Sequence, residues 1–148
     1  MGKRVFISLI AVAGLTATSI ALADIDELVE ARQDNFKVMG KNSKALRRMF
    51  GSNPDWQEIA ERVDKIQQAN HKLLDFFPPD SAETFVATEA KAEIWDDFDD
   101  FSAKQKTLAT RLDSLTQAIA AKDAKGSAKA FRQVGKACKA CHDKYREE

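Results

Sequence analysis

Apolar residues along most of the chain recur at intervals of three and four positions, which is the period of an amphipathic helix rather than of a strand. Four such stripes follow one another, over residues 25–50, 56–74, 94–119 and 130–145. No run of β-branched residues alternates with polar ones. The pattern therefore predicts an all-α chain built from four helices.

Turn signals separate the four stripes. Pro54 closes residues 51–54 and suits the first turn of the second helix, and residues 78–81, with two prolines, end that helix. We expect residues 81–92 to be a connection with a short helical turn, and residues 122–127 to be a tight turn. Short connections place successive helices antiparallel, so we predict an up-down-up-down four-helix bundle.

The first 23 residues have the pattern of a secretory signal peptide. Lys3 and Arg4 precede an apolar stretch over residues 5–22, which closes on Ala21-Leu22-Ala23. An uncleaved anchor is the alternative, but the stretch is barely long enough to span a bilayer. We therefore expect cleavage after Ala23, which leaves residues 24–148 as one domain with no membrane segment. We expect that domain to be periplasmic, in a bacterial exported protein.

Composition narrows the function classes. The 148 residues carry 23 Lys+Arg and 23 Asp+Glu. Such a balance provides no basic field for nucleic acid. The sequence offers no Ser-His-Asp set, paired carboxylate site or phosphate loop, so we do not expect an enzyme.

One motif carries specific chemistry. Cys138-Lys139-Ala140-Cys141-His142 has the C-x-x-C-H spacing of covalent haem attachment. Two thiols three positions apart lie on one side of a helical turn, where both reach the vinyl groups of one porphyrin. The histidine that follows is then held against the iron as an axial ligand. We therefore expect one haem c, and export agrees with this because bacterial haem c is attached outside the cytoplasm.

Two alternatives to haem fit the motif less well. A Cys138–Cys141 disulfide of the redox type belongs at a helix N-terminus after a strand, whereas this motif lies late in the last helix. A zinc site needs a fourth ligand, and His71, the only other histidine, has no sequence reason to converge on the motif. A bis-His haem is likewise not expected.

Four further residues bear on the haem. Met39 and Met49 lie on the apolar side of the first helix, where methionine is more often core than ligand; spacing alone leaves Met39 open as a sixth ligand. Arg32 is a charge on that same side, and it either snorkels to solvent or pairs with a haem propionate. Arg146 follows His142 by four positions, which places it one helical turn further along. It either shields the histidine, pairs with a propionate, or is a solvated cation at the end of the helix.

The mature chain as a whole resembles the cytochrome c′ family of class II c-type cytochromes. The resemblance rests on the C-terminal motif of residues 138–146, on Arg32-Gln33, and on Glu93-Ile94-Trp95. It implies a four-helix bundle that encloses a haem bonded to Cys138 and Cys141 and ligated by His142. The family's proline before Glu-Ile-Trp is Ala92 here.

The resemblance also implies a haem pocket. Arg32 and Gln33 correspond to a pair at the haem edge, and Phe36 to the distal position over the iron. Low-spin relatives of the cytochrome c-556 type carry a ligating Met at that position, and phenylalanine cannot coordinate iron, so the chain resembles the five-coordinate, high-spin type. Thr88 and Glu89 resemble residues that approach the haem in some members, and Arg146 would lie on the proximal side.

An apolar distal group favours small neutral ligands such as NO or CO over O₂, which gains from a polar donor. The resemblance thus implies gas binding with electron exchange, redox partner proteins, and a homodimer through the first two helices. One alternative is a low-spin electron carrier with a Met ligand. Another is a haem-free helical binding module.

Overall fold

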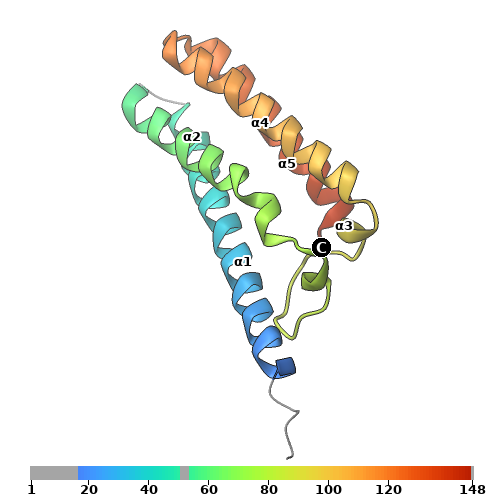
Figure 1. Ribbon diagram of the computed structural model, residues 1–148. Helices are drawn as coiled ribbons and strands as arrows, with labels where there is room; N and C mark the ends of the chain where they lie inside the picture. Colours follow the sequence, from blue (N-terminus) through green and yellow to red (C-terminus); the bar gives the residue numbers. More distant parts are fainter. Residues whose placement is uncertain (1–16, 51–53, 148) are drawn as a thin grey trace, which may run out of the picture.

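The computed structural model describes residues 17–50 and 54–147 of the chain, with side chains from residue 24 onward (Figure 1). The prediction of an all-α four-helix bundle is confirmed. Its long helices are α1 (Ala17–Met49), α2 (Trp56–His71), α4 (Phe98–Ala120) and α5 (Ala124–Tyr145). Three short helices lie between α2 and α4: η1 (Leu73–Phe76), η2 (Pro79–Ala82) and α3 (Glu93–Asp96).

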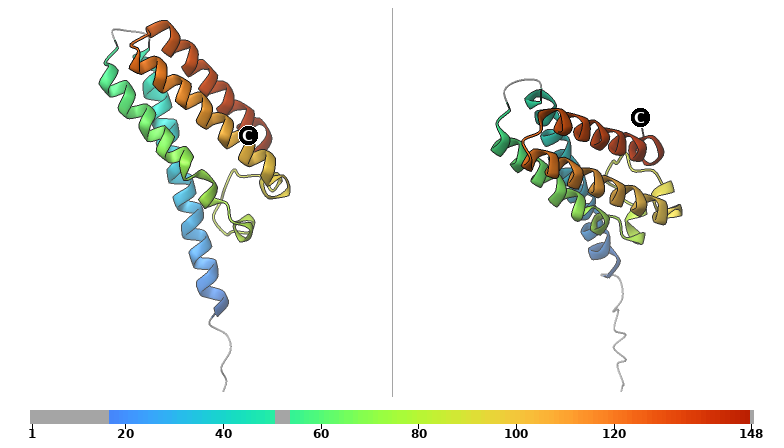
Figure 2. Two further views of the ribbon diagram at one scale, coloured as in Figure 1. Left: turned by 45° about the horizontal axis from the view of Figure 1, so that its top comes forward. Right: turned by 90° about the horizontal axis from the view of Figure 1, so that it is seen from above.

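The four long helices form two packed pairs, as Figures 1 and 2 show. α1 packs on α2, α4 packs on α5, and α2 packs on α4 to join the pairs. Over the described residues, α1 and α5 make no packing of comparable extent. The ring of four helices is therefore open between α1 and α5, and we call this the open side.

Two apolar clusters fill the interior. The main core joins all four long helices and consists of Met39, Leu46, Ile59, Val63, Ile66, Ala69, Leu108, Leu112, Leu115, Ile119 and Val134. The second core lies at the end of the bundle where α5 finishes, and consists of Leu73, Phe77, Ile94, Phe101 and Tyr145. Met39 is thus a packing residue of the main core, as its apolar stripe predicts.

Two predicted helix starts are wrong in detail. α2 begins after Pro54, because Asp55 caps it: one carboxylate oxygen accepts hydrogen bonds from the backbone N–H groups of Gln57 (3.0 Å) and Glu58 (3.1 Å). The tight turn before α5 is shorter than predicted, and Gly126 lies inside the first helical turn. A Cβ at Gly126 would clash with the capping carboxylate of Asp123, so a larger residue here would displace the cap.

The third stripe also divides into two helices. Asp97 leaves helical geometry at φ −134° and ψ 57°, ending α3 and capping α4 through the backbone N–H of Asp100. The second stripe is shortened similarly, because α2 ends at His71 and the chain tightens into η1. The apolar spacing continues across both breaks, so the sequence pattern predicts one continuous helix where the structure has two.

Residues 1–16, which hold most of the predicted signal peptide, lie outside the described residues. α1 as described starts at Ala17 and so includes the last seven residues before the predicted cleavage point. Among the helices described, none combines the length and the apolar character needed to cross a membrane.

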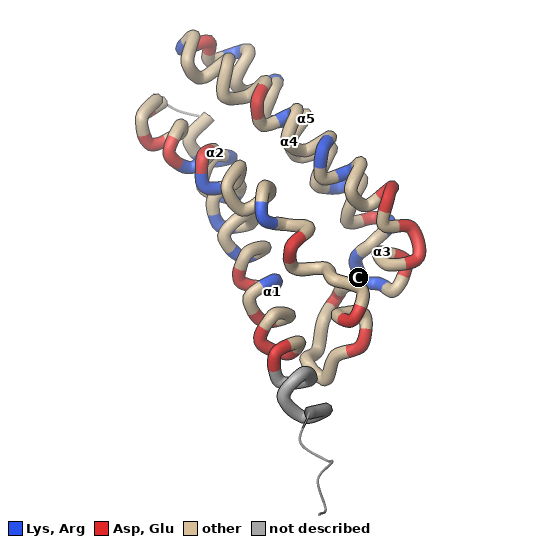
Figure 3. Tube along the Cα trace, viewed as in Figure 1, with Lys and Arg blue, Asp and Glu red and all other residues tan. Residues whose placement is uncertain are grey.

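Charge is polarised along α1. Residues 24–34 contain five acids and one arginine, whereas residues 37–48 contain five basic residues and no acid. Figure 3 shows the acids at the beginning of α1 and in the connection after α2. Of these charges, Arg47 and Arg48 lie in the last turn of α1, where cations complement the dipole of the helix.

Candidate functional site

The C-x-x-C-H motif lies on the last turns of α5, on the segment that reaches both cores. Cys138 packs against the main core and Cys141 against the second core, and both thiols are free. Burial raises the pKa of Cys138, and burial raises that of Cys141 to about 11. Both groups are therefore neutral thiols at neutral pH rather than the reactive thiolates of a redox disulfide.

His142 follows the two cysteines and is exposed at the surface of α5. Partial desolvation, and then the positive charge of Arg146, lower the pKa of this imidazole. A lowered pKa favours the neutral ring, which is the form that has a nitrogen lone pair to give to a metal.

Arg32 on α1 is the most unusual charge in the molecule, because only 1% of it is exposed. Its Nη2 donates to Thr88 Oγ1 at 3.3 Å, and its Nη1 has no hydrogen-bond partner among the described residues. Desolvation lowers the pKa of the guanidinium. Of the two alternatives for Arg32, snorkelling to solvent is therefore wrong, and a buried donor remains available to an anion.

Residues 84–91, which we call the strap, run between the two ends of the site. On the α1 side, the Gln33 amide donates to the carbonyl of Ala87 at 2.8 Å, next to the contact of Arg32 with Thr88. On the α5 side, Arg146 Nε donates to Glu89 Oε2 at 2.6 Å. The five residues predicted from the resemblance, Arg32, Gln33, Thr88, Glu89 and Arg146, thus lie along one connected path.

Arg146 lies one helical turn beyond His142, as the sequence spacing predicts, because its backbone N–H donates to the His142 carbonyl at 3.0 Å. Its own backbone then departs from the helix. α5 ends at Tyr145, and Arg146 is extended, with φ −122° and ψ 134°. It forms an isolated antiparallel bridge with Ala90, flanked by backbone hydrogen bonds from Lys91 N to Tyr145 O (3.1 Å) and from Glu147 N to Glu89 O (2.8 Å). Pairing with the strap thus turns the chain out of the helix.

Phe36, the predicted distal residue, lies one turn after Arg32 on α1 and keeps 36% of its surface exposed. Its ring meets Phe77 edge-on, with 6.4 Å between centroids. Phe77 also lies under the Arg32 guanidinium. The central carbon of that guanidinium is 4.6 Å from the Phe77 ring centroid and 5.7 Å from the Trp95 ring centroid. Sequence analysis missed Phe77 because it belongs to no helical stripe; the signal available was the double aromatic Phe76-Phe77 before two prolines.

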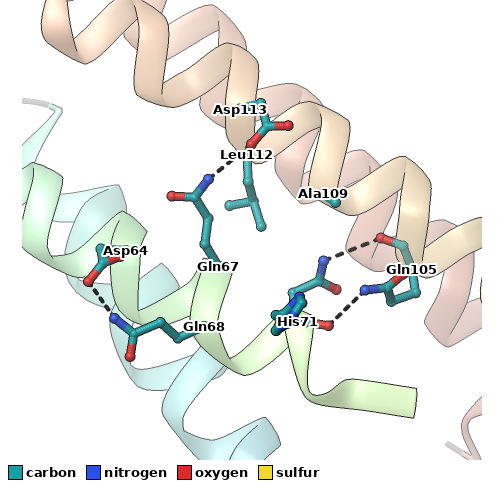
Figure 4. Close-up of a pocket in the computed structure, with 9 residues that line it drawn as sticks. Asp64, Gln67, Gln68, His71, Gln105, Ala109, Leu112 and Asp113 are labelled. Atoms are coloured by element: carbon teal, nitrogen blue, oxygen red, sulfur yellow. Dashed lines mark hydrogen bonds between the residues drawn. The ribbon is translucent and has the colours of Figure 1, made fainter. Parts of the chain in front are cut away.

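His71 lies elsewhere, on a groove of about 420 Å³ between α2 and α4 (Figure 4). Polar pairs line this groove: Gln67 donates to Asp113 at 3.1 Å, Gln68 donates to Asp64 at 2.6 Å, and Asn70 and Gln105 exchange two side chain–backbone bonds. Neither cysteine of the motif nor His142 borders it. Within residues 17–50 and 54–147, no group of three or more His, Cys, Asp or Glu side chains could hold a metal ion.

A polar cluster fixes the end of α5 to the start of α4. Asp100 accepts hydrogen bonds from Tyr145 Oη (2.6 Å) and Lys144 Nζ (2.9 Å), and Lys144 also donates to Asp97 at 2.8 Å. The Tyr145 hydroxyl, followed by Lys144, lowers the pKa of Asp100 to about 2. Tyr145 in turn packs edge-on against Phe101, with 5.3 Å between centroids.

This cluster gives a pH-dependent prediction. A carboxylate whose pKa is depressed stabilises the fold above its unfolded pKa of about 4, and that contribution disappears as the pH falls through about 2. We expect Asp100→Asn to lower the urea midpoint of unfolding at pH 7, and the difference from the parent to shrink between pH 4 and pH 2. Asp99→Asn removes a carboxylate on the same turn outside the cluster and serves as control. Parallel acid profiles for parent and Asp100→Asn would contradict the assignment.

The comparisons with known proteins agree with this geometry. The family model described as Cytochrome C′ matches residues 27–146, almost all of the described chain. The chain belongs to the cytochrome c′ family. A cytochrome c′ of Pararhodospirillum photometricum is 33% identical over 84% of this chain and 100% of its own length. A cytochrome c-556 of Agrobacterium tumefaciens is 32% identical over 80% of this chain and 95% of its own length.

Solved cytochrome c′ structures share the fold. The nitric oxide complex of a cytochrome c′ variant from Alcaligenes xylosoxidans superposes with a TM-score of 0.76 at 26% identity, covering 84% of this chain and 96% of that one. Membership in the cytochrome c′ family implies haem c. The residues present fit that group: two neutral thiols on one helical turn, an adjacent imidazole, and the buried unpartnered Nη1 of Arg32 for a propionate.

Proposed function

We propose that this chain is a periplasmic c-type haem protein that binds small neutral gases such as NO and CO at a five-coordinate iron and exchanges electrons. The observation that carries the proposal is that both sides of the site meet the second core: Cys141 of the motif packs against it, and Phe36 on α1 contacts its Phe77 edge-on. When bound, the haem supplies the iron that coordinates the gas and carries the electron.

Different residues would serve the two sides of the haem. Cys138 and Cys141 would bond the porphyrin as thioethers, and His142 would give its neutral imidazole to the iron. Phe36 would cover the opposite side with an apolar ring that offers neither an iron ligand nor a hydrogen-bond donor. Such a pocket discriminates against O₂ and admits CO or NO. The nitric oxide complex of the Alcaligenes xylosoxidans variant supports this reading.

The edges of the site would hold the propionates and limit access. Arg32 offers a buried donor for a carboxylate, with Gln33 and Thr88 beside it. Arg146 and Glu89 form an ion pair near His142 and would cover the proximal side. The alternative of a low-spin carrier ligated by Met39 is less supported, because Met39 packs within the main core.

The optical absorption spectrum of the exported, haem-loaded protein tests the proposal. We expect a high-spin spectrum in both oxidation states, with a shift of the reduced form on addition of CO. A low-spin spectrum that CO leaves unchanged would mean that a side chain occupies the sixth position, and the protein would then be an electron carrier. A chain that carries no haem after export would refute the proposal altogether.

We also propose a homodimer through α1 and α2. Val38, on α1, is an apolar residue with 42% of its surface exposed. A second copy of the chain would cover such a residue. Sedimentation equilibrium of the haem-loaded protein measures this directly, and a monomer at all concentrations would exclude the dimer.

A further inference from the structure

Arg32 is a buried cation that no carboxylate neutralises in the described part of the chain. Only one of its two terminal nitrogens has a partner, the hydroxyl of Thr88. An isolated charge in the interior costs several kcal/mol even after relaxation, so a fold retains one only where other groups compensate for it. The surroundings of Arg32 supply that compensation in an uncommon form.

Two aromatic rings lie against the guanidinium. Its central carbon is 4.6 Å from the Phe77 centroid and 5.7 Å from the Trp95 centroid, which is within the range of a cation–π contact. Both rings are held in place from behind. Trp95 Nε1 donates to the carbonyl of Pro78 at 3.0 Å, and Phe77 packs against Trp95 and Phe101 with centroids 5.8 and 4.9 Å away.

These two rings, Phe77 and Trp95, which we call the clamp, differ from an ion-pair partner in one respect. A carboxylate would neutralise Arg32 and use its donors, whereas an aromatic ring attracts the cation through its quadrupole and leaves both charge and donors available. Phe77 is 2% exposed and also touches Phe36, so one ring reaches both the buried cation and the distal residue.

We propose that Phe77 and Trp95 are positioning residues that clamp Arg32 so that its full positive charge and its unpartnered Nη1 act on the haem. This inference rests on the proposed function, because it assigns a regulator of the same site. A positive charge fixed at the edge of the haem would favour the reduced state, which carries one positive charge fewer. The clamp therefore raises the reduction potential, and it acts through Arg32.

A double-mutant cycle on the midpoint potential of the haem-loaded protein tests the clamp. We expect Phe77→Leu to lower the equilibrium constant for reduction about threefold, or about 28 mV at 59 mV per tenfold for one electron. Arg32→Gln should lower it at least as much. In the Arg32→Gln background, Phe77→Leu should have no further effect, because the charge that it positions is gone.

Phe50→Leu is the matched control, since it removes the same kind of ring from against the main core, where it packs on Phe131 and not on Arg32, Phe77 or Trp95. We expect it to leave the potential unchanged, although it also destabilises the fold in urea. Equal shifts from Phe77→Leu and Phe50→Leu, or additive shifts in the cycle, would overturn the clamp. A haem-stained denaturing gel separates this outcome from failure of the proposed function, which would appear as a parent protein without covalent haem.

Discussion

We expect the double variant Cys138→Ser, Cys141→Ser to lose the haem that stays attached to the parent chain under denaturing conditions. Both thiols lie on one turn of α5 and pack against the two cores, so each is placed to bond one side of a porphyrin. A serine hydroxyl forms no thioether with a vinyl group. His142 remains in the double variant, but a single coordination bond does not survive denaturation.

The measurement is a haem-stained denaturing gel of exported protein, normalised to the amount of chain. We expect loss of the signal in the double variant and a reduced signal in each single variant. Ala140→Ser places a serine between the two cysteines without removing a thiol, and it should stain like the parent. Haem retained at the parent level in the double variant would show that attachment does not depend on this motif.

Phe36→Met should convert the site from gas binding to six-coordinate ligation. The resemblance described above implies a ligating Met at this position in low-spin relatives, and the cytochrome c-556 of Agrobacterium tumefaciens is 32% identical to this chain, against 33% for the cytochrome c′ of Pararhodospirillum photometricum. A thioether at the sixth position must be displaced before CO binds. We therefore expect a low-spin spectrum and an affinity for CO that falls at least tenfold, which corresponds to about 1.4 kcal/mol.

Val38→Met is the matched control for that experiment. Val38 lies on the same helix, two positions on, and therefore on another side of α1, with 42% of its surface exposed. It should leave the spectrum and the CO affinity unchanged. A high-spin spectrum for Phe36→Met would show that residue 36 turns away from the iron, so that another group covers the distal side.

Local patterns predicted the parts of this molecule that depend on near neighbours. The four stripes predicted the four long helices, because an apolar stripe of period 3.6 buries itself only against another such stripe. The same reasoning placed Met39 in the core. The breaks at Asp97 and after His71 were not predicted, because apolar spacing continues across both and only the backbone reveals them.

The arrangement of the site was harder to predict from the sequence. The resemblance predicted Arg32, Thr88, Glu89 and Arg146, and the structure joins them in two pairs. It did not predict that Arg32 is buried or that Arg146 leaves the helix, because each depends on a partner more than 50 positions away. Phe77 is the clearest omission, since its contacts with Arg32 and Phe36 join segments about 40 positions apart in the sequence.

The strap has a consequence for the order of events during folding. Its contacts join residues separated by 54 to 59 positions, from Asp26 with Thr84 and Phe85 to Arg146 with Glu89. Contacts between such distant residues require a large loop to close, so they form after the local helices. Until then the end of α5 is not yet paired with residues 89–91, and the C-x-x-C-H motif stays accessible to whatever attaches the haem. The same pairing that later covers the proximal side would thus act as the closing step of maturation.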